Sequence, residues 1–301
     1  MEHRTFLQSL SKEQRRELTA RSNWHALLRL LLLVFCIVVC SAAILSSLFY
    51  TPFWIVIQGL LLVSLFHLMH ECIHDTVFTK RWPNRLVAYV CGFILFLPAN
   101  WFRCFHHAHH RYTQHPDKDP ELSSPKPSAL PQWLAHVSGV TTWYSQVRLL
   151  MQALVKPCRE SYIKKDNEEP VRLEMLVMIA GYIVLLLLSV VSKNAVLLSV
   201  WIIPLMVGQP FLRLYLLAEH AGCESGSNML RNTRTVLTNP VMRWSTWNMP
   251  YHTEHHVYPT VPFHQLPKLH TLLRAHLIEI NAGYIEFNRQ YAAQITSRKE
   301  A

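Results

Sequence analysis

Four long apolar runs are the feature that most restricts what this chain can fold into. They cover residues 26–49, 52–69, 173–192 and 195–217. Each run comes close to the roughly 20 residues that a helix needs to cross a bilayer. Only Tyr50 and Thr51 separate the first two runs, and only Lys193 and Asn194 separate the last two. We therefore predict two tight hairpins of membrane-spanning helices.

The charged residues predict an orientation for these helices. Apart from Lys193, the 29 Lys and Arg residues lie at or beyond the same ends of the four runs. Because positively charged loops stay in the cytoplasm, both termini and the long middle segment are predicted to be cytoplasmic. Residues 1–25 would be a cytosolic N-terminal segment, followed by one domain over residues 26–301. The apolar piece 86–98 is too short to cross and is predicted to be an interfacial helix.

The composition argues against several other classes of protein. Apolar residues make up 50% of the chain, yet its formal net charge is +10. This combination favours a membrane protein with a basic face toward anionic lipids, and no nucleic-acid partner is expected. Buried helices of a soluble protein would not place the charge on one side. The 7 cysteines form no CxxC pair, so a disulfide framework and a thiolate zinc site are not supported.

Histidines gather in four places on the predicted cytoplasmic side. HECIHD follows the second run, FHHAHH lies in the middle segment, LAEH ends the fourth run and HTEHH lies beyond it. Rings at positions i, i+3 and i+4 share one face of a helix, so each group can present its rings together. The candidate ligands are His70, His74, His106, His109, His110, His220, His252, His255 and His256.

This pattern indicates a metal site. Imidazole binds iron, zinc, copper and nickel, and so many rings exceed the capacity of one ion. We therefore predict two metal ions with four or five ring ligands each, and assign no separate general acid or base. Neighbouring groups could accept the second ring N–H and fix each ring's orientation. The candidates for this supporting role are His107, Glu71, Asp75, Glu219 and Glu254.

Aromatic residues flank the histidine groups, and two interpretations of them are open. They are Trp101, Phe102, Phe105, Trp244, Trp247 and Tyr251. Because Trp and Tyr are enriched where a membrane meets water, we expect an interfacial belt. The alternative is that they line a channel for an apolar substrate.

The histidine motifs resemble those of the membrane fatty acid desaturase family. The resemblance rests on HECIHD, on HHAHHRYT with DPEL after it, and on NMPYHTEHHVYPTVPFHQLP. It runs from about residue 50 to residue 270 and implies membership of the three-histidine-box superfamily of diiron integral membrane desaturases and hydroxylases. It also implies an all-α fold of four transmembrane helices and a cytosolic histidine-rich metal-binding cap.

The resemblance assigns roles residue by residue. His70 and His74 match the first box, and His220 matches the extra ligand after the last span. The second box matches His106, His109 and His110, and the third matches His252, His255 and His256. His107 has no ligand counterpart. Where acyl-CoA desaturases of the stearoyl type carry an asparagine before the extra histidine, this chain has Leu216, so their detailed geometry is not expected.

The function implied is desaturation of a fatty acyl lipid. Two iron ions would activate dioxygen to remove hydrogen from neighbouring carbons. No HPGG haem motif is present, so the electrons are expected from a separate ferredoxin or from a small cytochrome with its reductase. The carrier of the acyl chain is open: phospholipid, acyl-CoA or another carrier. Lipid hydroxylases and carotenoid ketolases share these motifs and are the alternative, and a membrane metal transporter is a more distant one.

Overall fold

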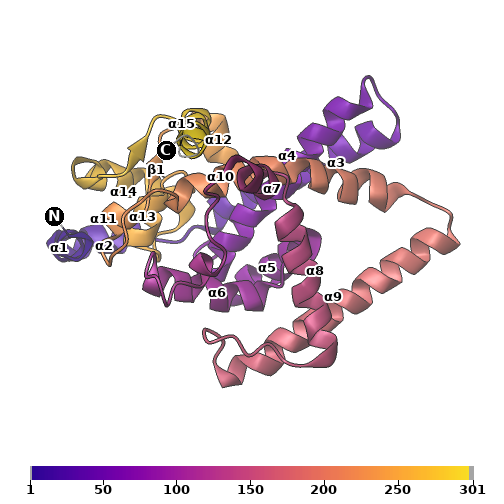
Figure 1. The fold of residues 1–301 in the computed structure, drawn as a ribbon, viewed down its shortest axis with the longest axis horizontal. Coiled ribbons are helices and arrows are strands. Elements are labelled where there is room, and N and C mark those ends of the chain that lie inside the picture. Colours follow the sequence, from indigo (N-terminus) through magenta and orange to yellow (C-terminus); the bar gives the residue numbers. More distant parts are fainter. Residues whose placement is uncertain (1, 298–301) are drawn as a thin grey trace.

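The computed structural model describes residues 2–297, and this part of the chain is mostly helical (Figure 1). The helices are α1 (His3–Ser9), α2 (Lys12–Leu18), α3 (Asn23–Leu45), α4 (Thr51–Ile73), α5 (Arg81–Leu95), α6 (Ala99–Tyr112), α7 (Leu130–Val137), α8 (Val140–Val155), α9 (Lys165–Val191), α10 (Ile203–His220), α11 (Met229–Asn232), α12 (Pro240–Ser245), α13 (His252–Val257), α14 (Leu266–Leu273) and α15 (Tyr284–Ser297). Shorter helical turns are η1 (Pro120–Ser123), η2 (Leu198–Ile202), η3 (Phe263–Gln265) and η4 (Arg274–His276). Strands β1 (Thr235–Val236) and β2 (Ile280–Asn281) pair in parallel.

Four helical segments within residues 2–297 are long and apolar enough to cross a bilayer. They are α2 with α3, α4, α9, and η2 with α10. The prediction of an all-α integral membrane protein is therefore confirmed. The helices extend beyond the apolar runs at the ends that carry histidines, where α4 reaches Ile73 and α10 reaches His220. Histidine and glutamate do not end a helix as Gly or Pro does, so hydropathy alone places these ends too early.

A helix is present where we predicted an interfacial one, but it is shifted, since α5 covers Arg81–Leu95 and not residues 86–98. It ends where Phe96 takes a left-handed backbone conformation with φ 59°. Pro98 follows and, with its fixed φ, stands as the residue before α6. The chain bends by 101° between α5 and α6. If this bent pair is taken as one broken span, the segments able to cross in the described range number five.

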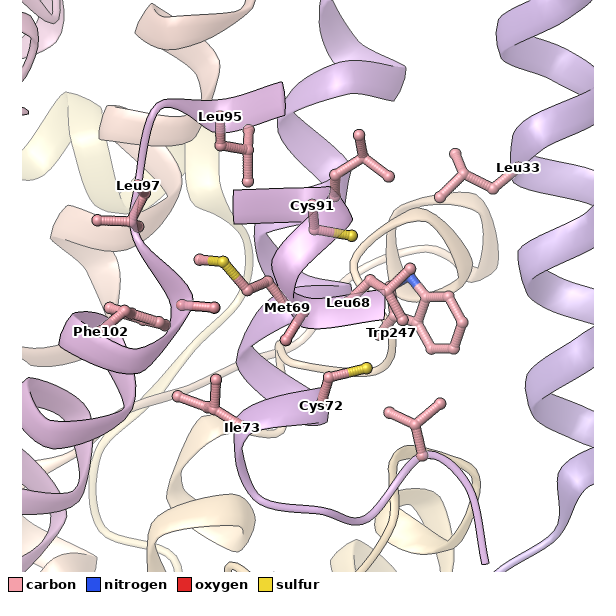
Figure 2. Close-up of a cluster of buried hydrophobic side chains, with 14 of the residues drawn as sticks. Leu33, Leu68, Met69, Cys72, Ile73, Cys91, Leu95, Leu97, Phe102 and Trp247 are labelled. Carbon is pink, nitrogen blue, oxygen red and sulfur yellow. The ribbon is translucent and has the colours of Figure 1, made fainter. Parts of the chain in front are cut away.

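The spans α3, α4 and α10 share an apolar core with α5. Figure 2 shows part of this core: Leu33, Leu68, Met69, Cys72, Ile73, Cys91, Leu95, Leu97, Phe102 and Trp247. Deeper in the membrane, α4 and α10 cross with almost no space between their backbones. A side chain at Gly59 would overlap the backbone of Pro204 and Gly208, and one at Gly208 would overlap the backbone of Gly59. Such small-residue contacts allow membrane helices to approach closely.

The second hairpin is open. After the turn that joins them, α9 and α10 diverge, and α9 packs on α8 and α6 (Figure 1). On the other side of this opening, α7 packs on α10, and α8 continues from α7 to α9. The short connection between α9 and α10 therefore does not keep the two helices together along their length. α8 links them at the open end, through its contacts with α9 and with α7.

A cap covers the ends of α4, α6 and α10. We use this name for residues 221–297 together with α1 and α2, which share an apolar cluster with one another. Arg29 of α3 attaches the cap to the spans, because its guanidinium lies 4.9–5.7 Å from the ring centres of Trp244, Trp247 and Phe263. These cation–π distances favour a fixed position of the cap on α3.

The Gly59–Gly208 crossing gives a stability prediction. We expect Gly59→Val to lower the stability of the detergent-solubilised chain by at least about 1–3 kcal/mol, the usual cost of overpacking. The measurement is the thermal unfolding midpoint. Leu60→Val is the control, because the neighbouring Leu60 is 36% exposed on the outer surface of α4. Equal midpoints for the two variants would contradict the close crossing.

Candidate metal centre

Four segments deliver the histidines to one region beneath the cap. The end of α4 carries His70, and His74 directly follows that helix. The end of α10 is His220 itself. α6 contributes the three rings of the FHHAHH spacing, and α13 contributes the three of HTEHH. All nine predicted ligands are thereby brought together, although they come from segments as far apart as residues 70 and 256.

The rings form two adjoining groups. In the first, one ring nitrogen of each histidine lies within 4.8 Å of the others; its members are His70, His74, His106, His110 and His255. The second group is His109, His220 and His256 by the same criterion. His252 joins the second group, because its Nε2 lies 3.1 Å from Nε2 of His220. The groups touch where the rings of His110 and His256 stack at 4.0 Å.

The chemistry of these nitrogens fits a metal ion. Nε2 of His110 lies 2.8 Å from Nε2 of His106 and 3.1 Å from Nε2 of His255. Several buried ring nitrogens have no hydrogen-bond partner among residues 2–297, including both of His70 and Nε2 of His256. Leaving such groups unpaired costs free energy, and converging neutral nitrogens are the donor set that iron, zinc or copper takes.

Burial keeps these rings neutral, as a metal ligand must be. Removal from water, and then the neighbouring rings, lower the pKa of His255 and His256 well below its usual value. His109 differs. Burial lowers its pKa, but the carboxylates of Glu121 and Asp119 outweigh this effect and raise the pKa above the usual value. In metal-bound histidine, the ring nitrogen that does not bind the metal typically donates a hydrogen bond to a carboxylate of this kind.

Asp119 and Glu121 were not among the predicted supporting residues. The Nδ1 atom of His109 lies 2.9 Å from Asp119 Oδ1 and 3.4 Å from Glu121 Oε2. Both carboxylates come from η1 and the residue before it, which follow α6 in the DPEL stretch. The side chain of Asp119 also accepts from the backbone N–H of Gln114 at 2.8 Å, which closes the loop toward the ring. The two acidic residues of DPEL, close after the second histidine group, were the sequence signal that could have identified these supporting carboxylates.

The predicted supporting carboxylates divide into two pairs. Glu219 and Glu71 lie against ligand rings, 3.3 Å from His252 Nδ1 and 3.7 Å from His255 Nδ1. The other two have different partners within the described chain: Asp75 pairs with Arg103 at 2.8 Å, and Glu254 with His270 at 2.5 Å.

Asp75 and Glu254 therefore hold segments in place around the centre. Glu254 also accepts from Thr235 of β1 at 2.7 Å, so it ties α13 to the strand and to α14. His107 is exposed on α6, with its ring 5.5 Å from that of His74.

A carboxylate far along the chain fixes α6. The side chain of Glu174, in α9, accepts from the backbone N–H groups of Ala99 and Asn100 at 2.6 and 2.8 Å. These are unpaired donors at the start of a helix, where negative charge is favourable. Glu174 therefore positions the helix that carries three of the candidate ligands. Nothing near residue 174 in the sequence indicates this role.

The prediction of an aromatic belt is wrong for the best-buried of the flanking aromatics. Trp247 is 1% exposed, Tyr251 6% and Phe102 6%. Phe102 lies 5.3 Å from Phe66 and 5.4 Å from His106 between ring centres. These residues pack inward because they sit where the cap meets the spans: Phe102 and Trp247 belong to the apolar core of the spans, and Tyr251 belongs to the apolar cluster of the cap.

These features define an integral membrane protein with a polyhistidine centre at the ends of its spans. The family model "Fatty acid desaturase" matches residues 46–288. The chain belongs to the fatty acid desaturase family.

Three relatives show how far the similarity reaches. The sn-1 oleoyl-lipid 12-desaturase of Picosynechococcus is 30% identical over 128 residues, covering 40% of this chain and 37% of the relative. The sphingolipid delta(4)-desaturase of Drosophila melanogaster is 26% identical over 216 residues, 70% of this chain and 62% of the relative. The sn-1 acyl-lipid omega-3 desaturase (ferredoxin) of Nostoc is 31% identical over 74 residues, 25% of this chain and 20% of the relative. The chain thus spans less than two thirds of each of these relatives.

The contact between Asp119 and His109 gives a metal-binding prediction. We expect Asp119→Ala to weaken metal affinity by about 10–100-fold, as loss of a partner behind a ligand ring usually does. Asp119→Asn should fall between this variant and the unsubstituted chain, because the amide oxygen can still accept from the ring. The measurement is metal content per chain during titration with a chelator.

Asp117→Ala is the matched control for this prediction. Asp117 lies two positions earlier and is exposed. If both alanine variants release metal at the same chelator concentration, Asp119 does not support His109.

Proposed function

We propose that this chain is a membrane-bound acyl-lipid desaturase that introduces a double bond into a fatty acyl chain. The observation that carries the proposal is the convergence of nine histidine rings, in two adjoining groups, at the ends of membrane helices. Family membership supports the same reaction. Each turnover would remove two hydrogens from adjacent carbons and combine them with one dioxygen, two electrons and two protons to give two waters.

Two irons are the metals we propose for this centre. One would be held by His70, His74, His106, His110 and His255, and the other by His109, His220, His252 and His256. Bound there, they would supply the redox chemistry that activates dioxygen, which side chains alone do not provide. The protein's own part is to keep the rings neutral by burying them, to orient them through Asp119, Glu219 and Glu71, and to keep the region dry.

The substrate's approach would be from the membrane. The ring of Phe102 lies beside those of Phe66, Phe105 and His106, so a cluster of apolar rings adjoins the centre. An acyl chain can lie against such rings without losing polar contacts, and the exclusion of water would protect a reactive site from side reactions. We place residues 26–301 in the catalytic domain, with residues 1–25 as its N-terminal cytosolic segment.

The centre is proposed to face the cytoplasm and to receive its electrons there. Support for this sidedness comes from the Lys and Arg residues, which apart from Lys193 lie on one side of the spans. The electron donor would be a separate ferredoxin or a small cytochrome with its reductase. The name of the Nostoc relative, which includes ferredoxin, favours the first.

Lipid profiling tests the reaction. The full chain, expressed in a host that lacks the corresponding double bonds but supplies an electron donor, is expected to yield new unsaturated acyl chains. The products are identified by mass spectrometry after derivatisation of the double bonds. Accumulation of hydroxylated or keto lipids alone would replace desaturation by the related oxygen-insertion reactions. Metal uptake without altered lipids would favour a transporter.

The two neighbouring histidines of α6 give an activity prediction. His109 is 2% exposed and lies in the second ring group, so we expect His109→Ala to abolish product formation and to lower bound iron. His107 is exposed and lies outside both groups. We expect His107→Ala to keep the iron and to lose at most about 10–100-fold in rate, the range for supporting residues. Complete loss of iron in both variants would contradict this assignment.

A further inference from the structure

The outer face of α8 is apolar and exposed, although this helix is too short to cross a membrane. Residues at helical spacing along one face are strongly exposed: Val140 64%, Tyr144 67%, Val147 51%, Met151 45%, Leu154 53% and Val155 82%. The basic residues Lys156 and Arg159 follow directly after the helix. An apolar stripe with flanking cations is the pattern of a helix that lies flat in a membrane interface. α8 also bridges the membrane helix α9 and α7, so this stripe continues the lipid-facing surface.

The inner side of α8 carries two polar residues near the start of the helix, whereas Leu150 and Ala153 further along are buried in an apolar cluster. Thr142 and Gln146 are one turn apart, so they lie on the same face of the helix. The hydroxyl of Thr142 accepts from Nη1 of Arg213 in α10 at 3.3 Å. The buried Oε1 of Gln146 has no partner among the described residues.

Other unpaired polar groups face the same interior. Gln209, one turn before Arg213 on α10, is 1% exposed, and its Oε1 has no partner in residues 2–297. The Cβ atom of Gln209 lies against Gly139, which joins α7 to α8. The buried Nε of Arg213 and Nε2 of His136 likewise have no hydrogen-bond partner in the described part of the chain. The carboxylates of Glu219 and Glu121 act on Arg213 electrostatically, and no ion pair joins either of them to Arg213 among the described residues.

The ring of His136 is affected by the charge of Arg213. Burial, and then the charge of Arg213, lower the pKa of His136 to about 4. The ring is therefore neutral at pH 7, and the cations that act on it are Arg213 and, more weakly, Lys126, which pairs with Glu121. Leaving a donor of a charged group and two amide oxygens unpaired at the same place is costly, so this arrangement favours a polar ligand.

The unpaired atoms indicate what that ligand must offer. Arg213 requires an anionic or carbonyl oxygen, since a guanidinium only donates. The amide oxygens of Gln146 and Gln209 require a hydroxyl or N–H donor. The polar end of a lipid can carry both kinds of group, and the exposed apolar stripe of α8 adjoins these residues through the contact of Thr142 with Arg213.

We propose that α7, α8 and α10 form a headgroup site, centred on Arg213, for the lipid whose acyl chain reaches the histidine centre. The headgroup passes α8 from the bilayer, and its anionic or carbonyl oxygen is held by Arg213 while its donors pair with Gln146 and Gln209. The identity of this lipid as substrate rests on the proposed function; the binding itself does not. Trp143, on α8 beside Thr142, lies 5.6 Å from Phe96 between ring centres, which gives the chain an apolar path below the headgroup.

Lipid binding to the purified full chain tests this proposal. Native mass spectrometry from detergent micelles is used with three probes: dioleoyl phosphatidylglycerol, dioleoyl phosphatidylcholine and oleate. The first carries a phosphate and hydroxyl donors, the second a phosphate without donors, and the third only a carboxylate. We expect the first to bind most tightly. Tightest binding of oleate would also support the site and would identify the carboxyl end of a fatty acid as its ligand.

The affinities of variants at two arginines test whether the lipid binds at Arg213. Arg213→Gln is expected to weaken the preferred probe by about tenfold or more, the usual effect of losing a hydrogen bond to a charged group. Arg213→Lys should fall in between, because it keeps the charge but not the fork of donors. Arg148→Gln is the control, since Arg148 is exposed on α8.

The proposal is overturned if the three probes bind alike, or if the Arg213 and Arg148 variants lose the same affinity. Metal content measured on the same samples shows whether each variant is folded at its centre. No turnover is involved, so an inactive enzyme leaves the binding result intact. Normal desaturation without selective binding would refute the headgroup site alone.

Discussion

Burial of many neutral imidazoles in one dry region is the constraint on which the rest of this structure depends. Unpaired ring nitrogens are costly in such surroundings, so the fold needs partners for both sides of each ring. The converging nitrogens suit metal ions on one side. Carboxylates, backbone and hydroxyl groups serve the other, as the backbone oxygen of Asn232 does for His220 at 3.0 Å and Thr113 does for His256 at 3.2 Å. α4, α6, α10 and α13 must therefore all bring their histidines to the same place.

The sequence was sufficient for those parts of the molecule that depend on local pattern. Hydropathy located the spans, helical spacing selected eight of the candidate rings, and the position of His220 at the end of the fourth span selected the ninth. Residues whose role depends on tertiary contact could not be found this way. Glu174 acts on α6 across 75 positions, and Arg213 of α10 reaches Thr142 of α8 across 71 positions. Asp119 is intermediate, since it lies close to the second histidine group but reaches His109 only because the loop folds back.

The positions of the helix ends show the same division. Apolar runs record where lipid surrounds a helix, whereas the helix itself stops where its hydrogen bonding stops. α4 and α10 continue past the apolar residues and carry their histidines out to the cap on rigid elements. α5 ends earlier than its apolar run because Phe96 and Pro98 turn the chain. Hydropathy thus indicates which part of each helix lipid surrounds. The backbone hydrogen bonds determine where each helix ends, and so where the candidate ligands lie.

The glycine crossing of α4 and α10 has a mechanical consequence for the histidine centre. The two helices run in the same direction, and His70 and His220 lie 11 and 12 residues beyond Gly59 and Gly208. At 1.5 Å per residue, both helices extend about 16–18 Å from the crossing point to these histidines. A small change in the crossing angle of α4 and α10 therefore produces a larger displacement of His70 relative to His220. A substitution deep in the bilayer can therefore shift the separation of the two ring groups without touching a single histidine.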